Sequence, residues 1–159
     1  GATEKFIGTW FQARKNRDKV ILASKVAGNG TTWMHDGSDI NRVSLLSSID
    51  GSLKRLQTDY IDLYQLHWPN RGSYHFGQLW NYKTKRNAKE EELENFLEVL
   101  TTLNSLVQSG KIRYIGLSNE TAWGTMQYLR LAETQNLPRV QSEQNEYSLL
   151  YRLHEGDMH

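Results

Sequence analysis

The chain has 159 residues, 38% of them hydrophobic and 23% charged, and its 19 basic side chains nearly balance 18 acidic ones. A net charge of +1 offers nucleic acid and anionic membranes little attraction, so we expect neither as a partner. The absence of cysteine excludes disulfides and thiolate metal sites. No apolar run reaches the roughly 20 residues that span a bilayer, and no signal peptide is evident. We therefore expect one globular domain over residues 1–159, in the cytoplasm.

The spacing of apolar residues predicts helices that alternate with strands. Apolar side chains three or four apart predict four amphipathic helices, over Thr3–Ala13, from Ser38 or Asp39 to Leu56, from Glu90 to Val107, and over Thr121–Gln135. Short apolar runs between the helices predict four strands, over Lys19–Val26, Tyr60–His67, Ile112–Leu117 and Val140–Tyr147. Ser38 or Asp39 is expected to cap the second helix, and Gly110 stands at the C′ position of the third.

A long segment without steady periodicity separates the second strand from the third helix. Residues 68–89 are rich in aromatic and basic side chains, including Tyr74, Phe76 and Trp80. Pro69 keeps the second strand from continuing into this segment. Loops of this length in a compact domain are usually functional or disordered.

The alternation of helices and strands predicts the α/β class, with a parallel sheet built from right-handed crossovers. The order of elements alone does not separate part of a (β/α)₈ barrel from a small doubly wound sheet. A complete barrel needs roughly 250 residues. If the fold is a TIM-type barrel, this chain is therefore expected to supply about half of it, as four βα units.

Polar residues stand where the predicted strands end: Lys25, His67, Ser118 with Asn119, and Gln144. Parallel α/β folds gather their reactive groups at the carboxyl ends of the strands. Taken singly, each residue has a structural explanation, because a lysine can be a solvated charge and a Ser-Asn pair can cap a helix. Together they place groups of complementary chemistry on one rim, which favours a functional site.

These side-chain types suit the reduction of a carbonyl by a nicotinamide cofactor. A lysine stabilises the conjugate base of a neighbouring proton donor, and a neutral histidine can donate a hydrogen bond to a carbonyl oxygen. Amide and hydroxyl groups can hold a carboxamide, while the cofactor supplies the hydride. A metal site is not expected, because His35, His67 and His75 lack ligand spacing. Gly-x-Ser-x-Gly, Walker and Gly-x-Gly-x-x-Gly motifs are also missing from the sequence.

Two segments resemble signatures of the aldo-keto reductase family: Asp50–Pro69, which reads DGSLKRLQTDYIDLYQLHWP, and Gly110–Asn119, which reads GKIRYIGLSN. The resemblance extends over nearly the whole chain, from Thr3–Gly8 to Gln144–Leu150. It is greatest to the bacterial Tas-like branch, which is related to potassium-channel β subunits. The resemblance implies a (β/α)₈ barrel that binds NADPH and reduces small aldehydes or ketones.

The resemblance also implies roles for individual residues. Lys25 matches the catalytic lysine that lowers the pKa of a tyrosine acid, and His67 matches the histidine that orients the substrate carbonyl. Residues 68–89 become a substrate loop, in which Trp68 is the candidate wall of the pocket. The substrate itself is not identified by this loop.

The residues that would hold the nicotinamide carboxamide are Ser118, Asn119 and Gln144. The family's proton-donating tyrosine, its aspartate partner and the later strands that grip the cofactor phosphates have no counterpart in this sequence. NADPH and NADH are therefore not distinguished. We expect a truncated chain, weakly active or inactive alone, whose open sheet edges favour a homo-oligomer.

Two alternatives remain open at the level of sequence. A non-catalytic nicotinamide-binding regulatory module, resembling a channel β subunit, would keep the barrel without turnover. The presence of both Lys25 and His67 favours the enzyme over this module. A small doubly wound domain with an unrelated ligand is the weaker alternative.

Overall fold

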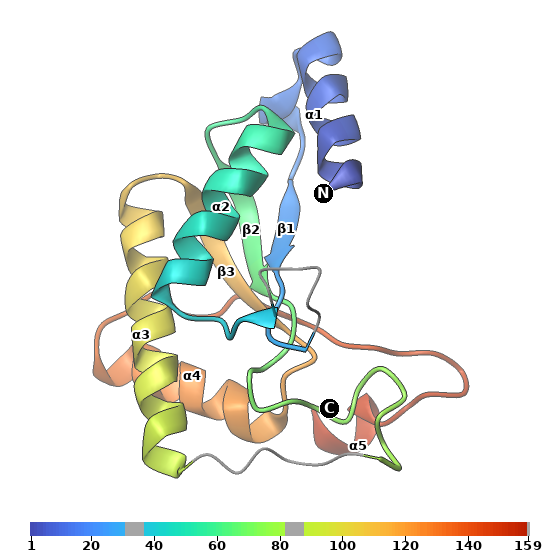
Figure 1. Cartoon of the computed structure of the whole chain (residues 1–159), viewed down its shortest axis with the longest axis vertical. Helices are drawn as coiled ribbons and strands as arrows, with labels where there is room; N and C mark the ends of the chain where they lie inside the picture. The colour runs from blue at the N-terminus through green and yellow to red at the C-terminus, as the bar shows by residue number, and fades with distance from the viewer. Residues whose placement is uncertain (31–36, 82–87, 159) are drawn as a thin grey trace.

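The computed structural model describes residues 1–30, 37–81 and 88–158, and within them it contains a four-stranded parallel sheet. The strands follow one another in chain order and are β1 (Ala23–Val26), β2 (Ile61–Leu66), β3 (Ile112–Ser118) and β4 (Ser142–Gln144). Each neighbouring pair is parallel, so all four carboxyl ends lie at one end of the sheet. In Figure 1 this is the lower end, where the segment after β2 and the helix α5 also lie.

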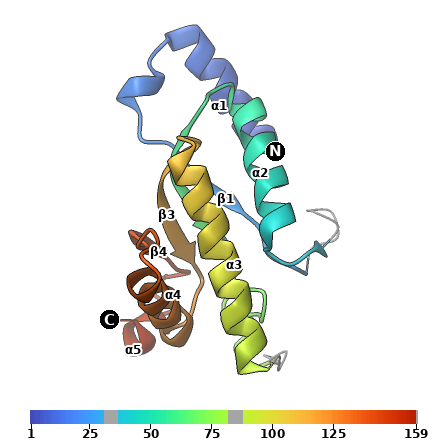
Figure 2. The ribbon, with the colours of Figure 1, turned by 90° about the vertical axis from the view of Figure 1, so that its left-hand side faces the viewer.

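Helices precede, connect and follow the strands. They are α1 (Ala2–Arg14), α2 (Arg42–Leu56), α3 (Lys89–Gln108), α4 (Ala122–Thr134) and α5 (His154–Asp157), with a 3₁₀ turn, η1, over Arg17–Lys19. Helices α2 and α3 run along the same face of the sheet (Figures 1 and 2). The parallel sheet with alternating helices confirms the predicted α/β class and agrees with part of a (β/α)₈ barrel. None of the described helices is long and apolar enough to cross a membrane.

Several boundaries differ from the sequence prediction for local reasons. The first strand begins at Ala23 rather than Lys19, because residues 17–19 form the turn η1. The Arg17 guanidinium donates to Val20 O at 2.8 Å and to Tyr60 O at 2.9 Å, which holds this turn outside the strand ladder. The fourth strand is limited to Ser142–Gln144, although the sequence predicted it over residues 140–147.

The cap of α2 is also not the predicted one. Asn41, rather than Ser38 or Asp39, caps the helix: its Oδ1 accepts from Ser44 N at 3.0 Å, and Ser44 Oγ accepts from Asn41 N at 2.9 Å. This reciprocal pair is a capping box with serine at the third helical position. The sequence motif was missed because such boxes usually carry Glu or Gln there.

Other predicted boundaries agree with the structure. Thr121 caps α4 by accepting a hydrogen bond from Gly124 N, and Gly110 follows α3 with a φ of +73°. The predicted loop over residues 68–89 is described over residues 68–81 and 88–89, and α3 begins at its last residue, Lys89. Residues 82–87 of this loop, and His35, lie outside the described residues.

The hydrophobic core lies between the sheet and the helices on that face. Leu45 and Ile49 of α2, with Val99 and Leu100 of α3, are completely buried against it. Tyr64 on β2 is also fully buried in this layer. Because β2 and β3 are anchored from behind by this core, their carboxyl ends are set in fixed relation to each other.

At the opposite end of the sheet, a buried carboxylate joins three segments. Asp62 on β2 accepts hydrogen bonds from Arg17 at 2.7 Å, from Arg113 on β3 at 2.8 Å and from Leu22 N at 2.9 Å. Burial alone would raise the pKa of Asp62, but the Leu22 N–H and the two guanidinium groups together lower it. In parallel α/β barrels the ligands bind at the carboxyl ends of the strands, so we interpret the contacts of Asp62 at the amino ends as stabilising the fold.

Candidate active site at the carboxyl ends of the strands

The register of the sheet aligns the predicted site residues in two cross-strand layers. Paired residues on parallel strands share a face, so each layer projects to the side away from the helices' core. The layer nearer the amino ends of the strands, called the lower layer whatever the orientation of Figure 1, contains Lys25, Gln65, Gly116 and Ser142, paired in that order across β1 to β4. The layer nearer the carboxyl ends, called the upper layer, contains His67, Ser118 and Gln144. Ser118 pairs with Gln144, and His67 lies beside Ser118 because the preceding residues Leu66 and Leu117 pair with each other.

A glycine makes the lower layer possible. A Cβ on Gly116 would lie 2.5 Å from Ser142 Oγ and 3.1 Å from Gln65 Cγ. Gln65 is 2% exposed and lies between Lys25 and Gly116 in this layer. Gln65 was not predicted as a site residue, because a glutamine in an apolar strand gives no functional signal by itself.

His67 is half-buried and held by its backbone on both sides. Its N–H donates to Val26 O at 2.9 Å, and its carbonyl accepts from Asn119 Nδ2 at 3.0 Å. Burial lowers the pKa of His67, and the charge of Lys25 lowers it further. The imidazole is therefore neutral at neutral pH, the state in which one ring nitrogen can donate to a carbonyl oxygen while the other carries no proton.

Ser118 and Asn119 connect three strand ends. Ser118 Oγ donates to Gln144 O at 2.7 Å, and Asn119 Nδ2 donates to both His67 O and Ser118 Oγ at 3.0 Å. Asn119 adopts a φ of +53°, a left-handed conformation that asparagine tolerates better than most residues. Ser118 and Asn119 are 3% and 4% exposed, whereas Gln144 is exposed. Of these three residues, Gln144 thus presents the most accessible amide.

The structure therefore brings Lys25, His67, Ser118, Asn119 and Gln144 together at one end of the sheet. Their roles in catalysis and cofactor binding stay predictions. The amide of Gln144 suits the carbonyl and amino groups of a carboxamide, which need one donor and one acceptor. A pocket of about 480 Å³ beside Gln144 is lined by Glu143, Asn145, Tyr147, His154 and Glu155.

Trp68, the predicted wall of the substrate pocket, is fixed beside His67. Its Nε1 donates to Asn29 O at 2.9 Å, and its ring centroid lies 4.5 Å from that of His67. A Cβ on Gly28 would lie 2.8 Å from the indole, so a glycine is required where Trp68 packs on the first loop. Phe76 meets Trp68 edge to face, with ring centroids 5.9 Å apart.

Phe76 was not predicted as a site residue. It has a φ of +58° and is 53% exposed, and its N–H donates to Glu146 Oε2 at 2.6 Å. Its ring also meets the His67 ring edge to face at 6.3 Å. The aromatic composition of the loop was visible in the sequence, but neither the positive φ nor the long-range bond to Glu146 leaves a sequence signal.

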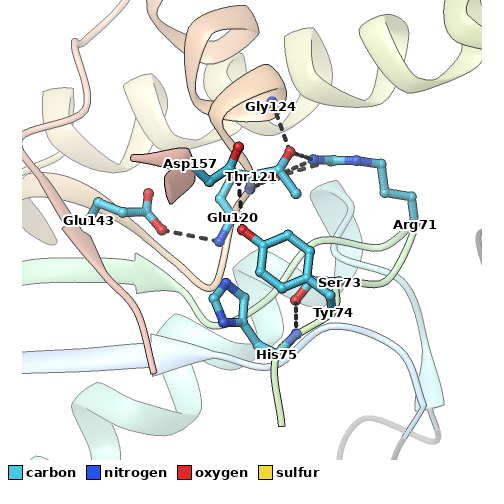
Figure 3. A network of polar contacts seen from close by, with 9 residues as sticks. All are labelled: Arg71, Ser73, Tyr74, His75, Glu120, Thr121, Gly124, Glu143 and Asp157. Atoms are coloured by element: carbon cyan, nitrogen blue, oxygen red, sulfur yellow. Dashed lines mark hydrogen bonds and ion pairs between the residues drawn. The ribbon is translucent and has the colours of Figure 1, made fainter. Parts of the chain in front are cut away.

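Behind the rim, Arg71 in the segment after β2 pairs with Glu120, which directly follows Asn119 (Figure 3). Burial raises the pKa of Glu120, and the neighbouring guanidinium opposes this rise. The Glu120 N–H donates to Glu143 Oε1 at 3.1 Å. Burial, together with the Glu120 charge, raises the pKa of Glu143 to about 7.

The last described segment of the chain packs on the loop after β2. Tyr74 Oη donates to Asp157 Oδ2 at 2.7 Å, and Tyr151 Oη donates to Tyr74 O at 3.1 Å. His75 is fully buried, with its ring centroid 4.7 Å from that of Tyr74 and 6.2 Å from that of Tyr151. No group of three or more potential metal-binding side chains occurs among residues 1–30, 37–81 and 88–158.

Comparison with known proteins gives a family match over almost the whole chain. The model of the Aldo/keto reductase family matches residues 1–158. Protein tas of Escherichia coli (strain K12) is 44% identical over 155 residues, which cover 96% of this chain and 44% of that protein. An aldo-keto reductase of Babesia bovis is 38% identical over 144 residues, covering 84% of this chain and 49% of that protein.

A third relative is named for its substrate. Norsolorinic acid reductase B of Aspergillus parasiticus is 34% identical over 133 residues, which cover 77% of this chain and 28% of that protein. The chain spans less than half the length of each of these three relatives.

Proposed function

We propose that this chain, which belongs to the aldo/keto reductase family, contributes to an NADPH-dependent reductase of aldehydes and ketones. In this proposal it supplies the residues that face the substrate carbonyl and those that face the nicotinamide carboxamide. The observation that carries this proposal is the alignment of His67, Ser118 and Gln144 in one cross-strand layer, with Lys25 in the layer below. Polar groups at the carboxyl ends of adjacent parallel strands are the usual place of chemistry in such folds.

The residues fit a nicotinamide cofactor. Gln144 would hold the carboxamide directly, since its side chain is exposed on the rim. Ser118 and Asn119 donate to the backbone carbonyl groups of Gln144 and His67, respectively. Among the described groups, Asn119 Oδ1 accepts only from the Glu146 N–H, at 3.2 Å, so a second lone pair of this oxygen is left for a ligand. When bound, the nicotinamide supplies the hydride.

His67 and Lys25 would act on the carbonyl and on its proton donor. The neutral imidazole of His67 donates a hydrogen bond to the carbonyl oxygen, which orients it and stabilises the negative charge that develops there. The ammonium of Lys25 stabilises the conjugate base of a neighbouring hydroxyl donor and so lowers its pKa. Burial lowers the pKa of His67 and the charge of Lys25 lowers it further, so the charge that would assist the donor also favours the neutral imidazole.

The aromatic side chains beside His67 favour a flat or apolar carbonyl compound as substrate. Trp68 and Phe76 present ring surface next to His67, and Phe76 is 53% exposed. Aromatic surface binds apolar ligands through burial and offset stacking. An aromatic aldehyde is therefore the first substrate to test.

The test is a two-stage assay on the natural polypeptide that carries these residues. NADPH and NADH are titrated with fluorescence detection, and an aromatic aldehyde is then added while the absorbance of the reduced nicotinamide is followed. Loss of absorbance that depends on the aldehyde supports the proposal. Binding without turnover would favour a nicotinamide-binding regulatory module instead, and no binding of either nucleotide would refute the proposal.

A further inference from the structure

Arg71 and Glu120 form a buried ion pair between the two loops that carry the proposed site. Arg71 Nη1 donates to Glu120 Oε2 at 3.2 Å, and Arg71 Nη2 donates to Glu120 Oε1 and, at 3.0 Å, to Thr121 Oγ1. The side chains are 13% and 4% exposed, respectively. Figure 3 shows the guanidinium of Arg71 pointing at the turn that begins α4.

The neighbourhood of this pair leaves little freedom to either side chain. The guanidinium carbon of Arg71 lies 5.4 Å from the ring centroid of Phe96 on α3 and 5.1 Å from that of Trp123 on α4. Glu120 Oε1 also accepts from Thr121 N at 2.7 Å. Two cation–π contacts to Arg71 and a backbone donor to Glu120 restrict the geometry of the pair.

A glycine in the first turn of α4 makes room for the pair. A Cβ on Gly124 would lie 2.3 Å from Glu120 Oε1 and 2.5 Å from Arg71 Nη2. Helix interiors disfavour glycine by about 1 kcal/mol relative to alanine. The glycine is therefore explained by the space that the ion pair needs.

Stability alone is a weak explanation for such a pair. Two buried charges lose much of their hydration, and apolar residues of similar volume are often equally stabilising or better. The position of the pair suggests a different purpose. Arg71 lies three residues after Trp68, and Glu120 directly follows Asn119, so the pair spans the gap between the carbonyl-facing and carboxamide-facing loops.

We propose that Arg71 and Glu120 are positioning residues, whose ion pair fixes the His67–Trp68 segment relative to Ser118, Asn119 and Gln144. This inference rests on the proposed function, because those two groups are the proposed binding sites for carbonyl and carboxamide. Neither Arg71 nor Glu120 touches a reactant. They act through the segments to which they belong, in parallel with the bond from Asn119 to His67 O.

The experiment compares two variants of the natural polypeptide. Arg71→Met leaves Glu120 buried without its partner and should lower the Tm strongly. The double variant Arg71→Met/Glu120→Met replaces both charges by apolar side chains and should regain most of that Tm. Despite the regained Tm, it should show at least about a tenfold rise in the Kd for NADPH and the KM for the aldehyde, with a smaller change in kcat.

Two glycine-to-alanine substitutions test the same inference, one at the ion pair and one as the matched control. Gly124→Ala should raise Kd and KM like the double variant, because its Cβ would displace the pair. Gly156→Ala on α5 places its Cβ in open space and should leave both constants unchanged. A double variant with recovered Tm and unchanged Kd and KM would show that the pair is only structural and overturn the inference.

Hydrogen exchange separates this inference from the proposed function. In the double variant, the amides of residues 70–76 should exchange faster, including Gly72 N, which donates to Pro69 O at 3.1 Å. If the unaltered polypeptide binds no NADPH, the proposed function fails, and exchange alone decides on the pair. Unchanged exchange in the double variant then overturns the positioning role, whereas faster exchange supports it.

Discussion

The predicted role of Lys25 depends on the positive charge of its side chain, which would lower the pKa of a neighbouring proton donor. Its backbone pairs with Gln65 in the lower layer, and after burial its charge is the second cause that lowers the pKa of the His67 imidazole. In an active polypeptide that carries these residues, Lys25→Met should reduce turnover by about 100-fold or more, the size of a general acid–base contribution. NADPH affinity should be preserved, since the lysine acts on the proton donor.

The control for Lys25→Met is Lys19→Met, which removes an exposed lysine from the turn η1 before β1. Steady-state kinetics and a fluorescence titration of both variants give the comparison. Normal turnover in Lys25→Met would remove this residue from the proposed mechanism.

Glu143 gives a pH-dependent prediction. Its pKa in the folded chain is raised to about 7 from an ordinary value of 4.5, so the folded state holds the proton more tightly than the unfolded state. Stability from this group is present below pH 4.5 and is lost as the pH rises to about 7. Glu143→Gln should therefore be more stable than the unaltered protein at pH 8, by on the order of 1–3 kcal/mol, and not at pH 4.

Urea unfolding at the two pH values measures this difference. Glutamine keeps the oxygen that accepts the Glu120 N–H, so the substitution tests the charge and spares the hydrogen bond. Glu98→Gln on the exposed side of α3 is the surface control. A stability gain of Glu143→Gln that is equal at pH 4 and pH 8 would contradict a raised pKa.

At the scale of elements, the contact of α1 with α2 is set by one glycine. A Cβ on Gly8 would lie 2.4 Å from Arg55 O and 2.8 Å from Leu56 C, both backbone atoms at the end of α2. Because backbone cannot give way as a side chain can, Gly8→Ala should lower the free energy of unfolding by about 1–3 kcal/mol. Chemical denaturation measures the change.

Gly51→Ala is the matched helical control. Its Cβ would meet only the far end of the flexible Arg55 side chain, with Nη1 at 2.9 Å, and alanine is a better helix former than glycine. This variant should be at least as stable as the unaltered protein. If Gly8→Ala were equally stable, α1 would not pack on α2 as described.

The elements that the sequence predicted well have strong local signals. Thr121 before α4 and Gly110 after α3 are cap residues whose chemistry fixes a boundary. The start of β1 was predicted too early, because the side chain of Arg17 binds carbonyl groups 3 and 43 residues away and the apolar run does not reveal these bonds. Long-range side-chain bonds of this kind are not encoded in local periodicity.

The same distinction applies to the candidate site. The rim residues could be predicted because each ends an apolar run, and parallel strands bring such ends together. Arg71 and Glu120 could not, because a charged residue in a loop is usually solvated and only the fold shows that these two are buried against each other. Phe76 required a positive φ that the sequence does not encode.

At the scale of the whole molecule, the face of the sheet that carries Lys25, Gln65 and Gly116, its inner face, contains two different environments. The carboxyl end carries the polar rim, and the amino end exposes apolar side chains, with Ile21 86% and Tyr114 58% exposed. A pocket of about 420 Å³ lies at that end, beside Leu63. Self-association through this face or through the sheet edges stays a prediction, which sedimentation of the polypeptide would test.

The central claim is that a nicotinamide binds at the carboxyl ends of the strands, and amide chemical shifts test this claim most directly. When oxidised nicotinamide nucleotide is titrated into isotopically labelled protein, the largest shifts should fall on Gln144, including its side-chain amide, and on His67 and Ser118. Ile21 and Tyr114 should not move, since they lie at the opposite end of the inner face. Shifts confined to that opposite end, or none at a saturating nucleotide concentration, would contradict the account.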